Sequence, residues 1–164
     1  MLQLMTTILL WFLAVGCGVM AGVYFAFSAF VMASLGRIDQ AAGIAAMNAI
    51  NVDIVRSLFM PLFFGTSLAS LALVVLAFLT WGNSSSAPAL AGAAIYVIGM
   101  FVVTILFNVP LNDALAVTDP GSPDSALLWT RYVATWTQWN HVRTLASAVA
   151  SALFIFALTR PELP

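Results

Sequence analysis

Four long apolar segments dominate the sequence and determine what the chain can fold into. They cover about residues 5–34, 55–81, 89–111 and 138–159, and each is long enough to cross a bilayer as a helix, which takes about 20 apolar residues. Only 7% of the chain is charged, against roughly 25% in ordinary soluble domains. The sequence therefore predicts an all-α integral membrane protein, a single domain over residues 1–164 that forms an up-and-down four-helix bundle.

The charges and the cysteine restrict the classes of partner. The basic residues are five arginines without a basic run, and the net charge is −1, so nucleic acid is excluded as a partner. Cys17 is the single cysteine and is expected to be a small buried hydrophobic residue. The expected partner is the lipid bilayer, and the expected location is multi-pass in a membrane, the bacterial inner membrane in particular.

A further helix is predicted between the first two spans. Asp39 follows a polar break and is placed to cap a helix over about residues 41–53. This helix would lie at the membrane interface before span two, with a kink near Pro61. Asp53 and Arg56 are three residues apart and could pair.

The last span is expected to begin as an interfacial extension. Asp124 is placed to cap a helix that continues unbroken over residues 125–159. Its first third carries Trp129, Arg131 and Tyr132, residue types that favour the membrane interface.

An up-and-down order brings the end of span one, the start of two, the end of three and the start of four to one side of the membrane. This convergence predicts a pocket between the helices, open to that membrane surface or just beneath it. The polar residues that gather there are Arg37, Asp39, Asn48, Asn51, Asp53, Arg56, Asn108, Asn112, Asp113, Arg131, Asn140, His141 and Arg143.

Span three ends in a polar stripe. Thr104, Asn108 and Asn112 recur every four residues, which places them on one helix face. Pro110 removes a backbone hydrogen bond and frees the carbonyl of Leu106. Neighbouring amides or a ligand would have to satisfy these groups, because polar groups inside a membrane need partners.

Helical phase divides the polar residues of span four. At about 100° per residue, Trp136, Asn140, Arg143 and Ser147 share a face, whereas His141 points about 100° away from Asn140. His141 is either a general base or a satisfied interfacial histidine. No metal site can be assembled from the residues present, and a haem with His141 as an axial ligand is the cofactor alternative that stays open.

Span one contributes two pairs with a spacing of four residues. Tyr24 and Ser28 face one side near its end and either pack against a neighbour or line a cavity. Gly18 and Gly22 allow close approach of a second helix, within the bundle or between two protomers of a homo-oligomer.

Several motifs resemble the anthrone oxygenase family of small four-span membrane proteins. The resemblance covers nearly the whole chain in the right order. The motifs are Gly22-Val23-Tyr24-Phe25-Ala26-Phe27-Ser28 with Val31-Met32, Met47-Asn48-Ala49-Ile50-Asn51, Phe107-Asn108-Val109-Pro110-Leu111-Asn112, and Trp136 with Trp139-Asn140-His141-Val142-Arg143-Thr144.

The resemblance implies oxidation of anthrones to anthraquinones by O₂ without a metal or flavin. The substrate would lose a proton, and side-chain donors would stabilise the resulting oxyanion, with His141 or Asp53 as the available base. Together with the face and stripe arguments, this predicts a catalytic group of Asn108, Asn112, Asn140, Arg143 and His141. The predicted substrate-binding group is Tyr24, Ser28, Asn51, Thr104 and Trp136.

The functional hypothesis is a cofactor-independent membrane oxygenase that acts on a hydrophobic phenolic or anthrone-like aromatic molecule. The alternative is a non-enzymatic protein that binds a small molecule or lipid, or an accessory subunit of a membrane complex. Transport is a third option, although no intramembrane carboxylate relay is visible. Four of the five arginines lie on the motif side, which would make that side cytoplasmic and put both termini outside.

Overall fold

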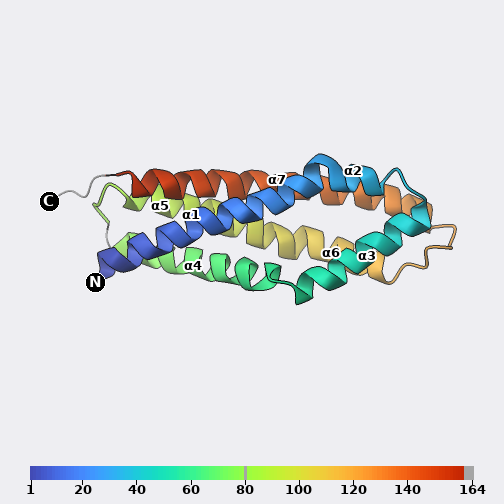
Figure 1. Ribbon diagram of the computed structural model, residues 1–164, viewed down its shortest axis with the longest axis horizontal. Coiled ribbons are helices and arrows are strands. Elements are labelled where there is room, and N and C mark those ends of the chain that lie inside the picture. Colours follow the sequence, from blue (N-terminus) through green and yellow to red (C-terminus); the bar gives the residue numbers. More distant parts are fainter. Residues whose placement is uncertain (80, 161–164) are drawn as a thin grey trace.

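The computed structural model describes residues 1–79 and 81–160. Within them, four helical rods are long and apolar enough to cross a membrane, namely Leu2–Leu35, Phe59–Leu79, Ser86–Ala116 and Ser125–Leu158. Both termini lie at one end of an elongated bundle, and the connections that follow the first and third rods lie at the other (Figure 1). The predicted up-and-down four-helix membrane bundle is confirmed.

The rods are built from α-helices interrupted by π-helical turns. Span one and span three both contain such turns near the end that carries the polar residues. In chain order the elements are α1 Leu2–Ala26, η1 Phe27–Val31, α2 Met32–Leu35, α3 Gln40–Arg56, α4 Phe59–Leu79, α5 Ser86–Tyr96, η2 Val97–Val102, η3 Thr104–Asn108, α6 Val109–Ala116 and α7 Ser125–Leu158.

The additional helix before span two is α3, and it begins directly after Asp39, as predicted. The Asp39 carboxylate accepts a hydrogen bond from the backbone N–H of Ala42 at 3.2 Å, as an N-cap does. The predicted ion pair between Asp53 and Arg56, both in the described part of the chain, does not form. Both side chains are exposed, where an ion pair contributes little.

The predicted kink near Pro61 is wrong, because the helix breaks four residues earlier. Ser57 leaves the helix with φ −94° and ψ 174°. Its hydroxyl donates to the Ile54 carbonyl at 2.8 Å and accepts from the Phe59 N–H at 3.1 Å, so it serves both helix ends. Pro61 then lies in the first turn of α4, where a missing N–H costs nothing.

The last helix is one unbroken rod, as expected, and Asp124 is its N-cap residue, but the carboxylate makes no capping bond. Ser125 organises this turn instead. Its hydroxyl donates to the Ser122 and Pro120 carbonyls at 2.7 and 2.9 Å and accepts from Gln40 of α3 at 2.6 Å. The contact ties the start of α7 to the start of α3.

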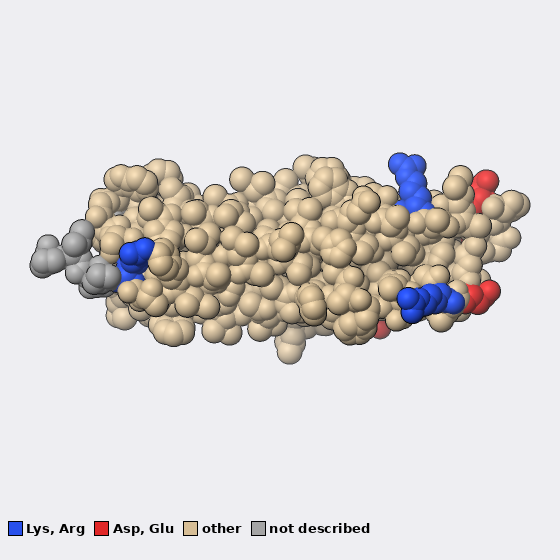
Figure 2. Space-filling model, turned by 90° about the horizontal axis from the view of Figure 1, so that it is seen from above, with Lys and Arg blue, Asp and Glu red and all other residues tan. Residues whose placement is uncertain are grey.

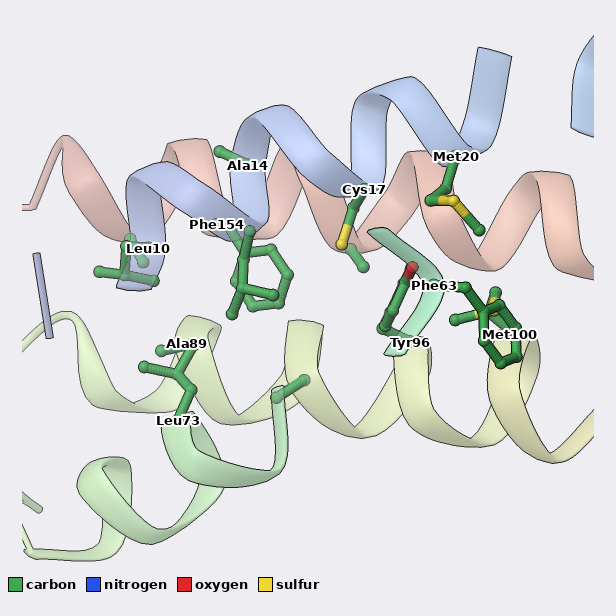
Figure 3. Packing of buried hydrophobic residues seen from close by; sticks show 14 of the residues in the cluster. Leu10, Ala14, Cys17, Met20, Phe63, Leu73, Ala89, Tyr96, Met100 and Phe154 are labelled. Carbon is green, nitrogen blue, oxygen red and sulfur yellow. The ribbon is translucent and has the colours of Figure 1, made fainter. Parts of the chain in front are cut away.

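Most of the bundle is held by an apolar core shared by all four spans. Side chains from α1, α4, α5 and α7 converge there, with Cys17 of α1 and Phe154 of α7 fully buried near Tyr96 (Figure 3). The expectation for Cys17 is therefore confirmed. Burial of this kind fixes the spans against one another through close packing rather than through hydrophobic transfer, because lipid is as apolar as the core.

Gly92 of α5 lies against Phe154 and Leu153 of α7. A Cβ at this position would lie 2.8 Å from a ring carbon of Phe154 and 3.2 Å from Cβ of Leu153. We expect Gly92→Ala to lower the free energy of unfolding by about 1–3 kcal/mol, since the buried ring has no room to shift. Thermal unfolding in detergent measures the effect.

Gly22 provides the matched control, because a Cβ there meets nothing within 4 Å. Gly22→Ala should leave the protein as stable as the parent or stabilise it by up to about 1 kcal/mol through helix propensity. Equal losses from both substitutions would show that Gly22 is covered, as in the homo-oligomer considered above.

A second apolar cluster closes the far end of the bundle. Met32, Ile44, Met47 and Leu115 pack there against the aromatic side chains of the first third of α7. The cluster holds α3 and α6 against α7. The visible charged side chains gather at the two ends of the molecule and leave an uncharged middle (Figure 2), as the apolar interior of a bilayer requires.

Candidate functional site

A cavity of about 190 Å³ lies between α1, α3, α4, α6 and α7, where the two apolar clusters meet. Its walls are mostly apolar. Six of the residues predicted for the site line it, and these are Tyr24, Asn51, Thr104, Asn112, Trp136 and Arg143. Side chains from all four spans and from α3 therefore line one cavity, whereas most of the polar residues expected at this side, such as Asn108 and Asn140, do not.

Arg143 is the one charged side chain that lines the cavity in the described part of the chain. It is 5% exposed. One terminal nitrogen donates to Asn140 Oδ1 at 2.7 Å, and the other lies 3.5 Å from Thr104 Oγ1. The guanidinium carbon lies 4.4 Å from the ring centre of Tyr24 and 4.9 Å from that of Trp136. Both rings therefore offer cation–π contact.

No carboxylate neutralises Arg143 among the described residues. The acidic side chains in this part of the chain are all exposed, and Nε of Arg143 is buried without a hydrogen-bond partner. A buried cation without a counterion is costly. The cavity thus holds a fixed positive charge that only neutral amide, hydroxyl and ring groups surround. The exposed acidic residues are Asp39, Asp53, Asp113, Asp119 and Asp124.

Asn140 positions this arginine and joins two spans. Its Nδ2 donates to the Tyr24 carbonyl and to Ser28 Oγ, each at 2.7 Å, while its Oδ1 accepts from Arg143. The π-helical turn η1 begins at Phe27, beside these acceptors, and such turns accommodate an inserted side chain. Asn140 is fully buried and does not line the cavity. Its amide therefore holds α7 to the end of span one.

Asn112 positions two aromatic side chains of α7, Trp136 and Tyr132. Its Oδ1 accepts from Trp136 Nε1 at 2.9 Å and from the Tyr132 hydroxyl at 2.8 Å. A carbonyl oxygen has two lone pairs, so this acceptor is fully used. Asn112 fixes the indole of Trp136 in the cavity wall.

Asn108 is buried but lies outside the cavity lining, so the prediction of a single polar stripe is wrong for this residue. Its Nδ2 donates to the Trp136 carbonyl at 3.2 Å. Asn108 ends the π-helical turn η3, in which the Val109 N–H bonds to the Thr104 carbonyl five residues back. Its amide bonds to α7 instead of lining the cavity.

Asn51 contributes the second free donor of the cavity. Its Nδ2 is buried and makes no well-formed hydrogen bond, although the Tyr132 hydroxyl lies near enough to interact with it, and the residue lines the cavity from α3. Asn48, three residues earlier, does not line it. Together with Nε of Arg143, the Asn51 amide gives the cavity two buried donors that a ligand oxygen could satisfy, and unmade hydrogen bonds of this kind are costly.

His141 lies on the outside of α7. It is exposed and absent from the cavity lining, whereas Trp136, Asn140 and Arg143 are buried. The separation inferred from helical phase is thus confirmed. Neither His141 nor Asp53 has the position that a base acting in this cavity needs. No histidine or carboxylate of the described residues lines the cavity, and no group of three or more His, Cys, Asp or Glu lies together among them.

The apolar walls were not predicted as part of the site. Met47, Phe59 and Phe63 line the cavity, but in an apolar segment such residues cannot be distinguished from ordinary core. Four further lining side chains are exposed on the outside of the bundle, so the cavity opens sideways between α3–α4 and η3–α6. These mouth residues are Val55 (61% exposed), Phe64 (48%), Ile105 (45%) and Val109 (36%).

These features define a small multi-pass membrane protein with a buried arginine–amide network beside a lateral cavity. The sequence model described as anthrone oxygenase matches residues 55–153, and the chain belongs to that family. The matched region contains the network residues of spans three and four, while Tyr24, Ser28 and Asn51 precede it. No curated protein and no solved structure matches the chain significantly.

Proposed function

We propose that this protein is a membrane oxygenase that oxidises a hydrophobic phenolic or anthrone-like substrate with O₂ and needs no metal or flavin. The observation that carries the proposal is Arg143, a buried cation without a described carboxylate partner that faces an apolar cavity. Membership of the anthrone oxygenase family supports the same reaction class. The proposed location is the bacterial inner membrane.

The chemistry requires an ionised substrate. Loss of a proton from a phenol, or from the methylene group of an anthrone, gives an oxyanion whose charge spreads over the ring and can reduce O₂ directly. Arg143 stabilises this anion, since a preorganised cation in a water-excluded site is strongly stabilising. The methylene carbon of an anthrone, or the ring C–H carbon of a phenol opposite its oxygen, then becomes a carbonyl carbon. The substrate loses two hydrogens, one oxygen atom of O₂ enters the product, and the other leaves as water.

No histidine or carboxylate of the described residues lines the cavity, so in this proposal the substrate gives its proton to water. Arg143 shifts this ionisation toward the anion. We therefore expect His141→Ala to change the rate of oxygen consumption by less than about twofold, as exposed positions away from a site do. A loss of more than about tenfold, which corresponds to about 1.4 kcal/mol, would show that His141 acts as the base.

Oxygen uptake by the purified protein tests the activity directly. Anthrone and 3-octylphenol are supplied separately in lipid nanodiscs, and O₂ loss is compared with quinone formation. We expect one-to-one stoichiometry between O₂ consumed and quinone formed with at least one of the two. Uptake no faster than that of empty nanodiscs would reject the oxygenase.

A non-enzymatic binding protein is the second candidate, and the amide bonds favour it. Asn140, Asn112 and Asn108 all make bonds that fasten spans together, which a purely structural network would also do. Arg143 distinguishes the two candidates. Neutral side chains could hold the spans together equally well, so a purely structural network does not explain why a charged residue is buried here.

The orientation in the membrane follows from the exposed arginines. Arg37, Arg56 and Arg131 are exposed near the end of the bundle that carries α3, and Arg160 is exposed near the other. Arg143 is buried and does not count. This excess of exposed arginines supports the proposal that the α3 end faces the cytoplasm and the opposite end faces the outside.

A further inference from the structure

The size of the cavity limits the ring system that it can hold. An engineered apolar cavity of about 150 Å³ binds benzene, and the present cavity, at about 190 Å³, is only about a quarter larger. It therefore has room for one aromatic ring with small substituents. Three fused rings would have to extend rigidly into the mouth or displace the walls, and close-packed interiors resist such displacement.

The mouth determines what can be attached to that ring. Val55, Phe64, Ile105 and Val109 line the cavity and are also exposed on the outside of the bundle. All four are apolar, and they face the region that lipid occupies. A flexible alkyl chain can pass between such side chains into the bilayer, whereas a charged or strongly hydrated substituent would lose its water there.

The polar groups orient the ring inside. Arg143 Nε and Asn51 Nδ2 are buried donors of the lining that make no well-formed hydrogen bond. The Tyr24 hydroxyl lies near the first of these side chains and the Tyr132 hydroxyl near the second. The two donors therefore favour a ligand oxygen that accepts hydrogen bonds. The rings of Tyr24 and Trp136 already lie beside the guanidinium. A phenolate oxygen fits this arrangement, because its negative charge would balance the positive charge of Arg143.

We propose that the cavity takes the single ring of an alkylphenol, with the phenolate oxygen at Arg143 and the alkyl chain leaving through the mouth into lipid. This assignment narrows the substrate class. Only oxidation of the bound alkylphenol rests on the proposed function. Binding itself requires no reaction with O₂.

Two phenols with fourteen carbons each provide the test of ring size. 3-Octylphenol has one ring and a chain, whereas 2-hydroxyanthracene has three fused rings and no chain. Both are titrated into nanodisc-embedded protein under argon, and each displaces 4-nitrophenol, whose bound anion is followed by its absorbance. We expect 3-octylphenol to bind about tenfold or more tightly than 2-hydroxyanthracene, a difference of at least one decade in Kd. Equal affinities, or tighter binding of the three-ring phenol, would overturn the proposal.

A pair of lipid-facing tryptophan substitutions tests the mouth. Ile105→Trp narrows the opening, while Leu68→Trp places the same side chain on the outside of α4, away from the cavity. The ratio of the affinity for 3-octylphenol to that for phenol should fall about tenfold in Ile105→Trp and stay at the parent value in Leu68→Trp. An unchanged ratio in both variants would place the chain elsewhere.

The binding assay also separates this proposal from the oxygenase. Tight, Ile105-sensitive binding of 3-octylphenol without oxygen uptake would support the alkylphenol site and reject the oxygenase. Oxidation of anthrone by a protein that prefers 2-hydroxyanthracene would support the oxygenase and overturn the alkylphenol site.

Discussion

Arg143→Met is expected to reduce oxygen consumption about 10²–10³-fold, the usual cost of removing a group that stabilises an oxyanion, while lowering the free energy of unfolding by no more than about 1–3 kcal/mol. This loss is the cost of leaving the buried Asn140 Oδ1 without its donor. It is partly offset, because the substitution also removes a buried charge that has no described carboxylate partner. Initial rates and thermal unfolding are measured on the same preparation.

Arg143→Lys is the matched control for charge. It keeps the cation but loses the planar fork that reaches Asn140 and Thr104, so its activity should lie between those of the parent and Arg143→Met. If Arg143→Met instead lowers the free energy of unfolding by clearly more than about 1–3 kcal/mol, the cost of one unsatisfied group, the arginine fastens the bundle, and the non-enzymatic candidate is favoured.

Asn140→Ala is expected to have the opposite signature and to lower the free energy of unfolding by about 3–5 kcal/mol. The substitution removes the bonds from Asn140 to the Tyr24 carbonyl and Ser28, and it leaves Arg143 without its closest partner. Each buried group left unsatisfied costs about 1–3 kcal/mol, and more for a charged one. Denaturant unfolding in mixed micelles measures the loss.

Gln138→Ala, two residues earlier on the exposed side of α7, controls for a polar-to-alanine change in the same helix. It should change the stability by less than about 0.5 kcal/mol. If Asn140→Ala were as mild as Gln138→Ala, the amide would not be what joins α7 to span one.

Much of the fold was predictable because apolar length and helical phase are local properties of the sequence. Four spans in up-and-down order follow from segment length, and the buried position of Arg143 and exposed position of His141 follow from about 100° per residue along α7. The cap at Asp39 was equally local. These inferences required no knowledge of how the helices meet.

The errors arise where backbone geometry departs from a regular α-helix. The kink was predicted at Pro61, because proline usually interrupts a helix. The helix breaks at Ser57 instead, whose hydroxyl bonds to both neighbouring helix ends. The stripe through Asn108 assumed that all three of its residues face one cavity, whereas the Asn108 amide bonds to the Trp136 carbonyl of α7. The break at Ser57 rests on local bonds of a serine that composition does not single out, and the position of Asn108 depends on a contact with another helix.

The cavity itself could not be predicted from the sequence. Its apolar walls have the composition of ordinary core, and its position depends on how α3 and α4 separate after Ser57. The absence of a base among the lining residues likewise emerges only when His141 and Asp53 are placed in three dimensions.

The central claim is that Arg143 holds an oxyanion in the cavity. The most direct test is the titration of bound 4-nitrophenol in nanodiscs, followed by the absorbance of its anion, with the parent and Arg143→Met compared. A cation within about 4–6 Å should favour the anion by about one to three pH units, so the bound phenol should ionise at lower pH in the parent than in the variant. Identical midpoints in the two proteins would contradict the claim.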